Sequence, residues 1–267
     1  MSDRAPDGTA YEFTGCADAP VLILIHGLGL SRRMWDELVP PLAQHYLVLT
    51  YDLYGHGDSA PLPADASLDN YADQIANLMK TFGIETATII GFSIGGMINR
   101  RFALNHGAHV SSLVILNSPH DRGKAGQQQI EERAARVREE GPLATLGEAL
   151  KRWFTPEFRA ARPEIIDEVR SWRSGVDPKS YARAAWILAS GVPELIAPDP
   201  PITCPVLVMT CENDSGSTPA MSVAIARECT EARLFIVPDL KHLGLMERPN
   251  DFVAKIRDFL QTQPTDN

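Results

Sequence analysis

One serine lies in a sequence pattern that is typical of nucleophilic catalysis. The segment 91–96 reads GFSIGG, follows the apolar run 86–90 and precedes an apolar, helix-like stretch over 97–104. In such a strand, turn and helix context, the GxSxG pattern exposes a serine on a tight turn, and the glycines permit that turn. The first amides of the helix favour an anion. We therefore predict that Ser93 is a nucleophile rather than part of a purely structural connection.

A serine hydroxyl is a poor nucleophile until a base takes its proton, so a histidine is required elsewhere. His242 follows the apolar run 234–237 near the end of the chain. This position matches the chain order serine, acid, histidine that accompanies the GxSxG turn. His120, which follows the run 110–116, is an alternative that is expected to line the pocket. The other histidines are interpreted as loop or solvent-exposed residues: His26, His45, His56, His106 and His109.

The acid that orients the histidine is expected after the apolar run 206–209. Glu212 and Asp214 both stand there, and Asp214 comes directly before the turn-forming segment 215–219 (SGSTP). Serine, glycine and proline favour such turns, so Asp214 is preferred over Glu212. Acyl transfer also needs donors for the developing oxyanion. The backbone amides of Leu28 and Ile94 are the candidates.

The alternation of apolar runs with amphipathic stretches predicts an α/β fold with a doubly wound, mostly parallel sheet. Short apolar runs of this kind are typical of buried parallel strands. The amphipathic stretch that starts after Ser67 is the clearest predicted helix. The predicted strands cover 21–25, 46–51, 86–90, 110–116, 206–209 and 234–237.

The alternation stops over 120–201, where the chain is rich in Arg, Glu, Ala and Trp. We predict a helical cap (lid) there, inserted into a core formed by 1–119 and 202–267. Its helices are expected at 127–140, 143–154, 163–172 and 178–190. Such a cap would cover the carboxyl ends of the strands, where open α/β sheets bind ligands. The candidate substrate-binding residues are His120, Trp153 and Trp186, although tryptophans at helical spacing, Trp172 included, often pack between cap and core.

The composition limits the classes of partner. The 267 residues carry a net charge of −9, which repels nucleic acid phosphates and anionic lipid surfaces. No apolar run is long enough to span a membrane, and 1–20 lacks the pattern of a secretory signal. We expect a cytoplasmic monomer or homodimer that binds a small molecule and needs no metal or organic cofactor. The four cysteines have no CxxC spacing and are interpreted as reduced.

These motifs together resemble the α/β-hydrolase superfamily over nearly the whole chain. The resemblance rests on the His26-Gly27 loop, the segment 55–59 (GHGDS), the Ser93 turn, Asp214 and His242. It implies an α/β-hydrolase fold with a helical cap inserted after the sixth strand. The segments 33–35 (RMW), 152–158 (RWFTPEF) and 177–181 (DPKSY) are similar to 3-oxoadipate enol-lactonases. The chain departs from that subfamily in a short leading segment, where part of the usual hairpin is expected to be missing, and at 191–192.

The resemblance implies a serine hydrolase that cleaves a small carboxylic ester or lactone through an acyl-enzyme. Three alternatives remain: carbon–carbon bond hydrolysis, perhydrolysis, and a receptor that turns its ligand over slowly. Four basic residues near the start of the cap are candidates for attracting a carboxylate substrate: Arg122, Lys124, Arg133 and Arg136.

Overall fold

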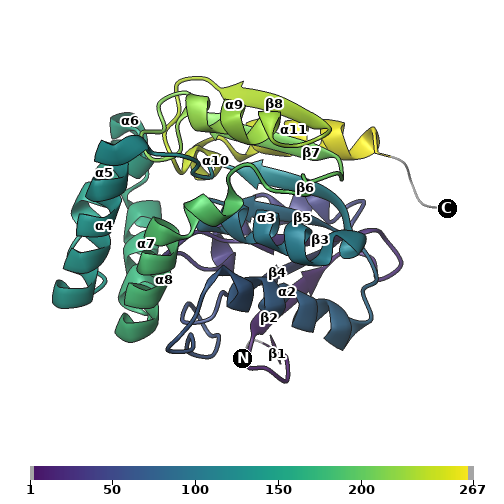
Figure 1. Cartoon of the computed structure of the whole chain (residues 1–267), viewed down its shortest axis with the longest axis horizontal. Helices are drawn as coiled ribbons and strands as arrows, with labels where there is room; N and C mark the ends of the chain where they lie inside the picture. The colour runs from purple at the N-terminus through teal and green to yellow at the C-terminus, as the bar shows by residue number, and fades with distance from the viewer. Residues whose placement is uncertain (1–2, 264–267) are drawn as a thin grey trace.

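The computed structural model describes residues 3–263 and has helices on both faces of one central sheet (Figure 1). Eight strands follow the order β1-β2-β4-β3-β5-β6-β7-β8, in which β1, β2 and β4 pair antiparallel and all other neighbours pair parallel. This confirms the predicted fold class. The strands are β1 (Asp3–Arg4), β2 (Ala10–Thr14), β3 (Val21–Ile25), β4 (Leu47–Tyr51), β5 (Ala87–Phe92), β6 (Val110–Leu116), β7 (Val206–Cys211) and β8 (Ala232–Val237).

The leading hairpin is present, so the expectation that part of it is missing was wrong. β1 pairs with β2, and β2 continues onto the sheet through pairs such as Tyr11 with Tyr51. Both strands were overlooked because they lie at the sheet edge and lack a continuous apolar run; both residues of β1 are exposed. Hydrogen bonds to β4 hold β2 in place.

The helices divide between the two faces of the sheet, as the two apolar clusters indicate. One cluster joins the sheet to α2 (Leu68–Phe82), α3 (Ile94–His106) and α9 (Pro219–Arg227). The other joins it to η1 (Arg32–Trp35) and α11 (Pro249–Gln261). The short remaining elements of the core are α1 (Val39–Leu42), η2 (Gly107–His109), η3 (Val192–Leu195) and α10 (Gly244–Glu247).

Local signals in the sequence explain where α2 begins and ends. The Ser67 side chain accepts from the Asp69 amide, and Asn70 Oδ1 accepts from the Ser67 amide, so donors that the helix itself leaves unpaired are satisfied. Gly83 ends the helix with a φ of +66°, a conformation that glycine adopts without strain. The buried face of α2 packs on the sheet beside α3.

Five helices follow β6 and lie together at one end of the molecule (Figure 1). Thr155 ties them to the core, because its hydroxyl donates to Glu247 Oε2 at 2.6 Å and its amide to Glu247 Oε1 at 2.8 Å. The sequence did not predict α6, a six-residue helix that begins at Pro156. The helices of this cap are α4 (Gly123–Glu140), α5 (Leu146–Trp153), α6 (Pro156–Ala161), α7 (Pro163–Ser174) and α8 (Pro178–Ser190). Over residues 3–263, no helix is both long and apolar enough to cross a membrane.

The parallel register brings the ends of six strands, β3 to β8, to one edge of the sheet. Ile25 pairs with Gly91, Phe92 with Leu116, and Cys211 with Val237. Loops that follow these strands therefore meet at that edge. The cap helices lie beside it.

Candidate active site

Ser93 occupies a strained turn between β5 and α3. Its φ of 58° and ψ of −114° are unusual for a residue with a side chain. The neighbouring glycines allow the close approach that this turn needs: a Cβ at Gly91 would lie 2.1 Å from the carbonyl oxygen of Gly95. The Ser93 amide donates to the carbonyl of Leu116 at 2.8 Å, which anchors the turn to β6.

The structure brings the three predicted residues together in one chain of hydrogen bonds. His242 Nε2 lies 3.1 Å from Ser93 Oγ, and His242 Nδ1 lies 2.6 Å from Asp214 Oδ2. Asp214 accepts from Nδ1, so Nδ1 carries the hydrogen and Nε2 is free to accept a proton. Ser93, Asp214 and His242 follow β5, β7 and β8, respectively.

Asp214 is buried and held as a carboxylate. Burial raises the pKa of its carboxyl, but the charge of His242 and hydrogen bonds from His242, Asn117 and the Ser217 amide outweigh burial, so the pKa is lowered overall. Asp214 Oδ1 accepts from the amides of Gly216 at 2.9 Å and Ser217 at 3.0 Å. These two bonds stabilise a turn after Asp214, at the place where the sequence of 215–219 predicted one.

Asn117 is a site residue whose contribution was missed. Its Nδ2 donates to Asp214 Oδ2 at 2.9 Å, and its φ is 46°. From the sequence, Asn117 was rejected as the acid and given no other role. Its position directly after β6, at the same edge of the sheet as Ser93, could have indicated that it lies in the site. The rejected candidate, Glu212, is exposed and accepts from the Asp239 amide at 3.1 Å.

The two backbone donors lie beside the serine. Ile94 is the first residue of α3, where the helix leaves its amide unpaired. Leu28 lines the same cavity as Ser93 and follows β3. Its amide has no hydrogen-bond partner within residues 3–263.

A cavity lies between this edge of the sheet and the cap. Ser93 and His242 line it from the core, and the candidate Trp153 lines it from the cap. Trp186 does not: it is 53% exposed, because α8 turns Tyr181 and Ala185 toward the cavity instead. The structure therefore places Trp186 outside this cavity.

His120 is likewise not among the residues that line the cavity. Its Nε2 lies 3.0 Å from Glu228 Oε1, so the side chain contacts the segment that follows α9 rather than the pocket. A buried histidine that bonds a carboxylate fits the ordinary packing interpretation. The third cap tryptophan, Trp172, packs against the core cluster.

Four arginines line the cavity, and no carboxylate side chain is among its lining residues. Two of them, Arg122 and Arg133, were candidates from the sequence. Arg152 and Arg173 were missed, because the spacing along a helix does not say which face turns inward. The other two candidates, Lys124 and Arg136, are exposed, and Arg136 pairs with Glu140 and Glu148.

The four arginines differ in their partners. Arg173 is held by Pro142 O at 2.9 Å and Thr145 Oγ1 at 3.0 Å, and it stacks over the Tyr181 ring. The carbonyl of Leu188 accepts from Arg122 at 2.9 Å. Within residues 3–263, Arg133 and Arg152 have neither a hydrogen-bond nor an ion-pair partner. Burial, together with the nearby charge of Arg133, lowers the pKa of Arg152 to about 10.

Comparison with known proteins identifies the family to which this fold belongs. The family model described as the alpha/beta hydrolase fold matches residues 20–249. The chain belongs to the α/β-hydrolase family.

Two relatives of the chain come from Acinetobacter baylyi. One is an (E)-2-((N-methylformamido)methylene)succinate hydrolase, 27% identical over 96% of this chain and 95% of the relative. The other is 3-oxoadipate enol-lactonase 2, 28% identical over 91% of this chain and 89% of the relative. The crystal structure of the enol-lactonase from Burkholderia xenovorans is similar with a TM-score of 0.88 and 27% identity, and it covers 95% of this chain and 96% of that one. This α/β hydrolase therefore resembles enol-lactonases, as its cap segments suggested.

Proposed function

We propose that this α/β hydrolase is a serine hydrolase that cleaves a small carboxylic ester or lactone through an acyl-enzyme intermediate. The observation that carries the proposal is the hydrogen-bond chain from Ser93 through His242 to Asp214 at the wall of the cavity. A serine paired with a histidine, which a buried carboxylate orients, is the arrangement that nucleophilic acyl transfer requires.

In the first half of the reaction, Ser93 Oγ attacks the carbonyl carbon while His242 Nε2 takes the hydroxyl proton. Negative charge moves to the carbonyl oxygen, and the amides of Leu28 and Ile94 stabilise it. His242 then donates its proton to the leaving oxygen as the ester bond breaks. Ser93 is left acylated, and the leaving oxygen becomes a hydroxyl or an enol.

In the second half, water attacks the acyl-enzyme. His242 takes a proton from this water, and the oxyanion forms again at the same two amides. Collapse of the intermediate breaks the bond to Ser93 Oγ, which recovers its proton from His242. The product acid leaves, and His242 returns to its neutral form.

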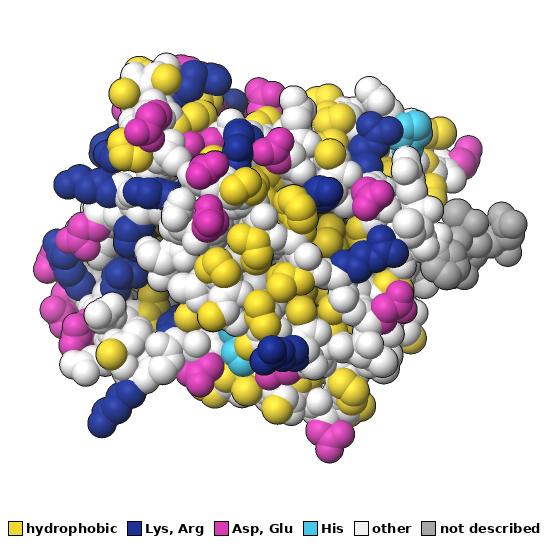
Figure 2. Space-filling view, turned by 90° about the horizontal axis from the view of Figure 1, so that it is seen from above, with side chains coloured by type: hydrophobic (Ala, Val, Ile, Leu, Met, Phe, Trp, Pro, Cys, Tyr) yellow, Lys and Arg dark blue, Asp and Glu magenta, His cyan; other side chains and the backbone are white. Residues whose placement is uncertain are grey.

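The cavity arginines favour a substrate that carries a carboxylate. Among the residues that the structure describes, the guanidinium groups of Arg133 and Arg152 have no partner, and guanidinium binds carboxylate through paired hydrogen bonds. The chain as a whole has a net charge of −9, but the cap has none, since 120–201 contains 13 basic and 13 acidic residues. Figure 2 shows Lys and Arg side chains gathered at the cap end of the molecule. The relatives named above act on a succinate derivative and an oxoadipate lactone, which supports an anionic substrate.

Turnover of 4-nitrophenyl esters tests the proposal. We expect continuous hydrolysis of the acetate and butyrate, with a lower kcat/KM for the decanoate, because cap residues such as Ile130 and Trp153 close the cavity. The measurement is steady-state release of nitrophenol over many enzyme equivalents. A single stoichiometric burst would instead indicate a slow receptor, and a steady rise in kcat/KM toward decanoate would refute a closed acyl site.

Loss of a cavity arginine should weaken binding of anionic substrates selectively. We expect Arg133→Gln or Arg152→Gln to raise KM for 4-nitrophenyl hydrogen succinate about 10-fold or more, since a hydrogen bond to a charged group contributes about 1.5–3 kcal/mol. KM for the neutral 4-nitrophenyl butyrate should change little. Steady-state kinetics with both esters measures the difference.

Arg136→Gln is the matched control, because Arg136 lies one turn from Arg133 on α4 but pairs with Glu140 and Glu148 outside the cavity. It should leave both KM values unchanged. Equal effects of the Arg133 and Arg136 substitutions would mean that general surface charge, not a carboxylate subsite, attracts the substrate.

A further inference from the structure

The loop after β3 forms a tight turn around Leu28. The Leu30 amide donates to the carbonyl of Gly27 at 3.1 Å, and Gly29 has a φ of +71°. Leu28 is the second residue of this turn, and the turn does not use its amide. The amide is therefore available to an oxyanion, but only if the turn holds it in the right direction.

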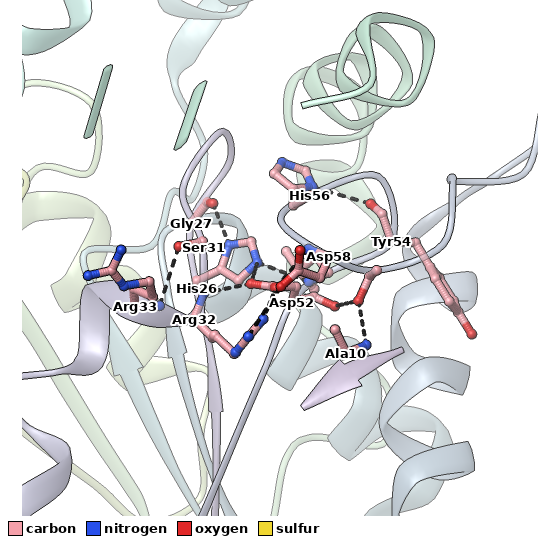
Figure 3. A network of polar contacts seen from close by, with 12 residues as sticks. Ala10, His26, Gly27, Ser31, Arg32, Arg33, Asp52, Tyr54, His56 and Asp58 are labelled. Carbon is pink, nitrogen blue, oxygen red and sulfur yellow. Dashed lines mark hydrogen bonds and ion pairs between the residues drawn. The ribbon is translucent and has the colours of Figure 1, made fainter. Parts of the chain in front are cut away.

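A buried histidine fixes the peptide group that contains the Leu28 amide. The carbonyl of Gly27 and the amide of Leu28 belong to one planar trans peptide, so a bond to the oxygen sets the direction of the N–H. His26 Nδ1 lies 2.8 Å from the carbonyl oxygen of Gly27, and His26 Nε2 accepts from the Leu53 amide at 2.9 Å. Figure 3 shows the bond between His26 and Gly27.

A second buried histidine, His56, fixes the next peptide group. The Gly29 amide donates to His56 Nε2 at 3.0 Å. His56 Nδ1 lies 3.2 Å from the carbonyl oxygen of Tyr54, a bond that Figure 3 shows. A carbonyl only accepts, so Nδ1 carries the hydrogen and Nε2 is the acceptor. The peptides on both sides of the Leu28 Cα are thus each bonded to an imidazole.

His56 is suited to remain a neutral acceptor. Its side chain is buried, and burial together with the nearby His26 lowers its pKa to about 3. The loop that carries it is held by Asp52, whose Oδ2 accepts from the Asp58 amide at 3.0 Å and whose Oδ1 accepts from the Arg32 amide at 2.8 Å. Asp52 therefore joins the loop of His56 to the loop of Leu28.

Side chains of the cap also pack closely against this turn. A Cβ at Gly29 would lie 2.6 Å from Arg173 Cδ and 2.9 Å from Tyr181 Cε2. The bond to His56 and these close cap side chains together leave the turn little room to reorient.

We propose that His56 is a positioning residue of the oxyanion hole. It does not touch the substrate; its bond to the Gly29 amide holds the peptide that follows Leu28 and so keeps the Leu28 amide directed at the developing oxyanion. The inference rests on the proposed function, because it assigns this residue a part in stabilising the acyl-transfer transition state.

Replacement of His56 should lower kcat far more than it changes KM. We expect His56→Leu to reduce kcat for 4-nitrophenyl butyrate about 10- to 100-fold, less than the loss of a whole oxyanion donor, with KM within about 3-fold. Affinity for a trifluoromethyl ketone, which forms a tetrahedral adduct with the serine, should fall in proportion to kcat/KM. A merely structural role would lower thermal stability without this proportionality.

Two polar variants keep the test decisive if His56→Leu does not fold. Glutamine places an acceptor near the position of Nε2, whereas asparagine is too short to reach the Gly29 amide. We expect His56→Gln to recover much of kcat and His56→Asn to remain impaired. Equal kcat values in the two variants would overturn the positioning role.

His106→Leu is the control, because His106 packs against Phe102 on α3 and does not line the cavity. It should leave kcat and ketone affinity unchanged. If Ser93→Ala is inactive while His56→Leu retains wild-type kcat and ketone affinity, the inference about His56 fails and the proposed function stands. If Ser93→Ala remains active, the proposed function itself fails.

Discussion

Ser93→Ala is expected to reduce kcat for 4-nitrophenyl butyrate by about 10⁶-fold, as loss of the nucleophile does in a serine hydrolase with this set of residues. The reason is chemical: alanine has no oxygen to form the acyl-enzyme, and His242 cannot replace it. Any residual hydrolysis should come from attack by water on a substrate that the cavity binds and the amides of Leu28 and Ile94 polarise. Steady-state kinetics, with circular dichroism on the same sample, measures the loss.

The variant should fold, because His242 is the only hydrogen-bond partner of Ser93 Oγ within residues 3–263, and the bond from the Ser93 amide to Leu116 remains. Alanine also keeps the Cβ, so the strain of the turn is unchanged. Ser222→Ala is a matched control, since Ser222 is buried on α9 and its hydroxyl has no hydrogen-bond partner among the described residues. A folded Ser93→Ala protein with more than a small fraction of activity would remove Ser93 from the mechanism.

The sequence predicted the parts of the fold that depend on local pattern. The apolar runs of β3 and β6 have the same bounds in the structure as in the prediction, because strands in the interior of a parallel sheet are buried and therefore largely apolar. The turn at Ser93 was recognisable for a similar reason: only glycine tolerates the close backbone contacts at 91 and 95. The edge strands β1 and β2 carry no such signal.

Features that depend on how distant segments pack were not predictable. The histidines of the β3 and β4 loops were interpreted as turn residues, yet His56 bonds the amide of Gly29, 27 residues away. The inward side of the cap helices was equally hidden: Trp153 and Arg152 line the cavity, whereas Trp186 is exposed. Helical spacing gives the faces of a helix but not the partner that each face meets.

Asp214→Asn should reduce kcat by about 10⁴-fold while leaving KM nearly unchanged. Asparagine retains an oxygen that can accept from the amides of Gly216 and Ser217, so the turn should persist. Its NH₂ group then faces His242 Nδ1 and the Nδ2 donor of Asn117, where Asp214 Oδ2 had accepted from both. A donor there forces His242 into the tautomer with hydrogen on Nε2, which cannot take the proton of Ser93. The loss therefore arises from the wrong tautomer and not from a lost fold.

Glu212→Gln provides the matched control for the choice of acid. Glu212 is exposed, and the bond that its carboxylate accepts from the Asp239 amide can be replaced by the glutamine oxygen. We expect kcat within about 2-fold of wild type, because the charge of a solvent-exposed carboxylate is screened by water and contributes little to the interactions of other residues. Both variants should be compared by kcat, KM and thermal unfolding. A severe loss for Glu212→Gln together with an active Asp214→Asn protein would make Glu212 the residue that orients His242, and the 2.6 Å bond between Asp214 and His242 would then have no catalytic meaning.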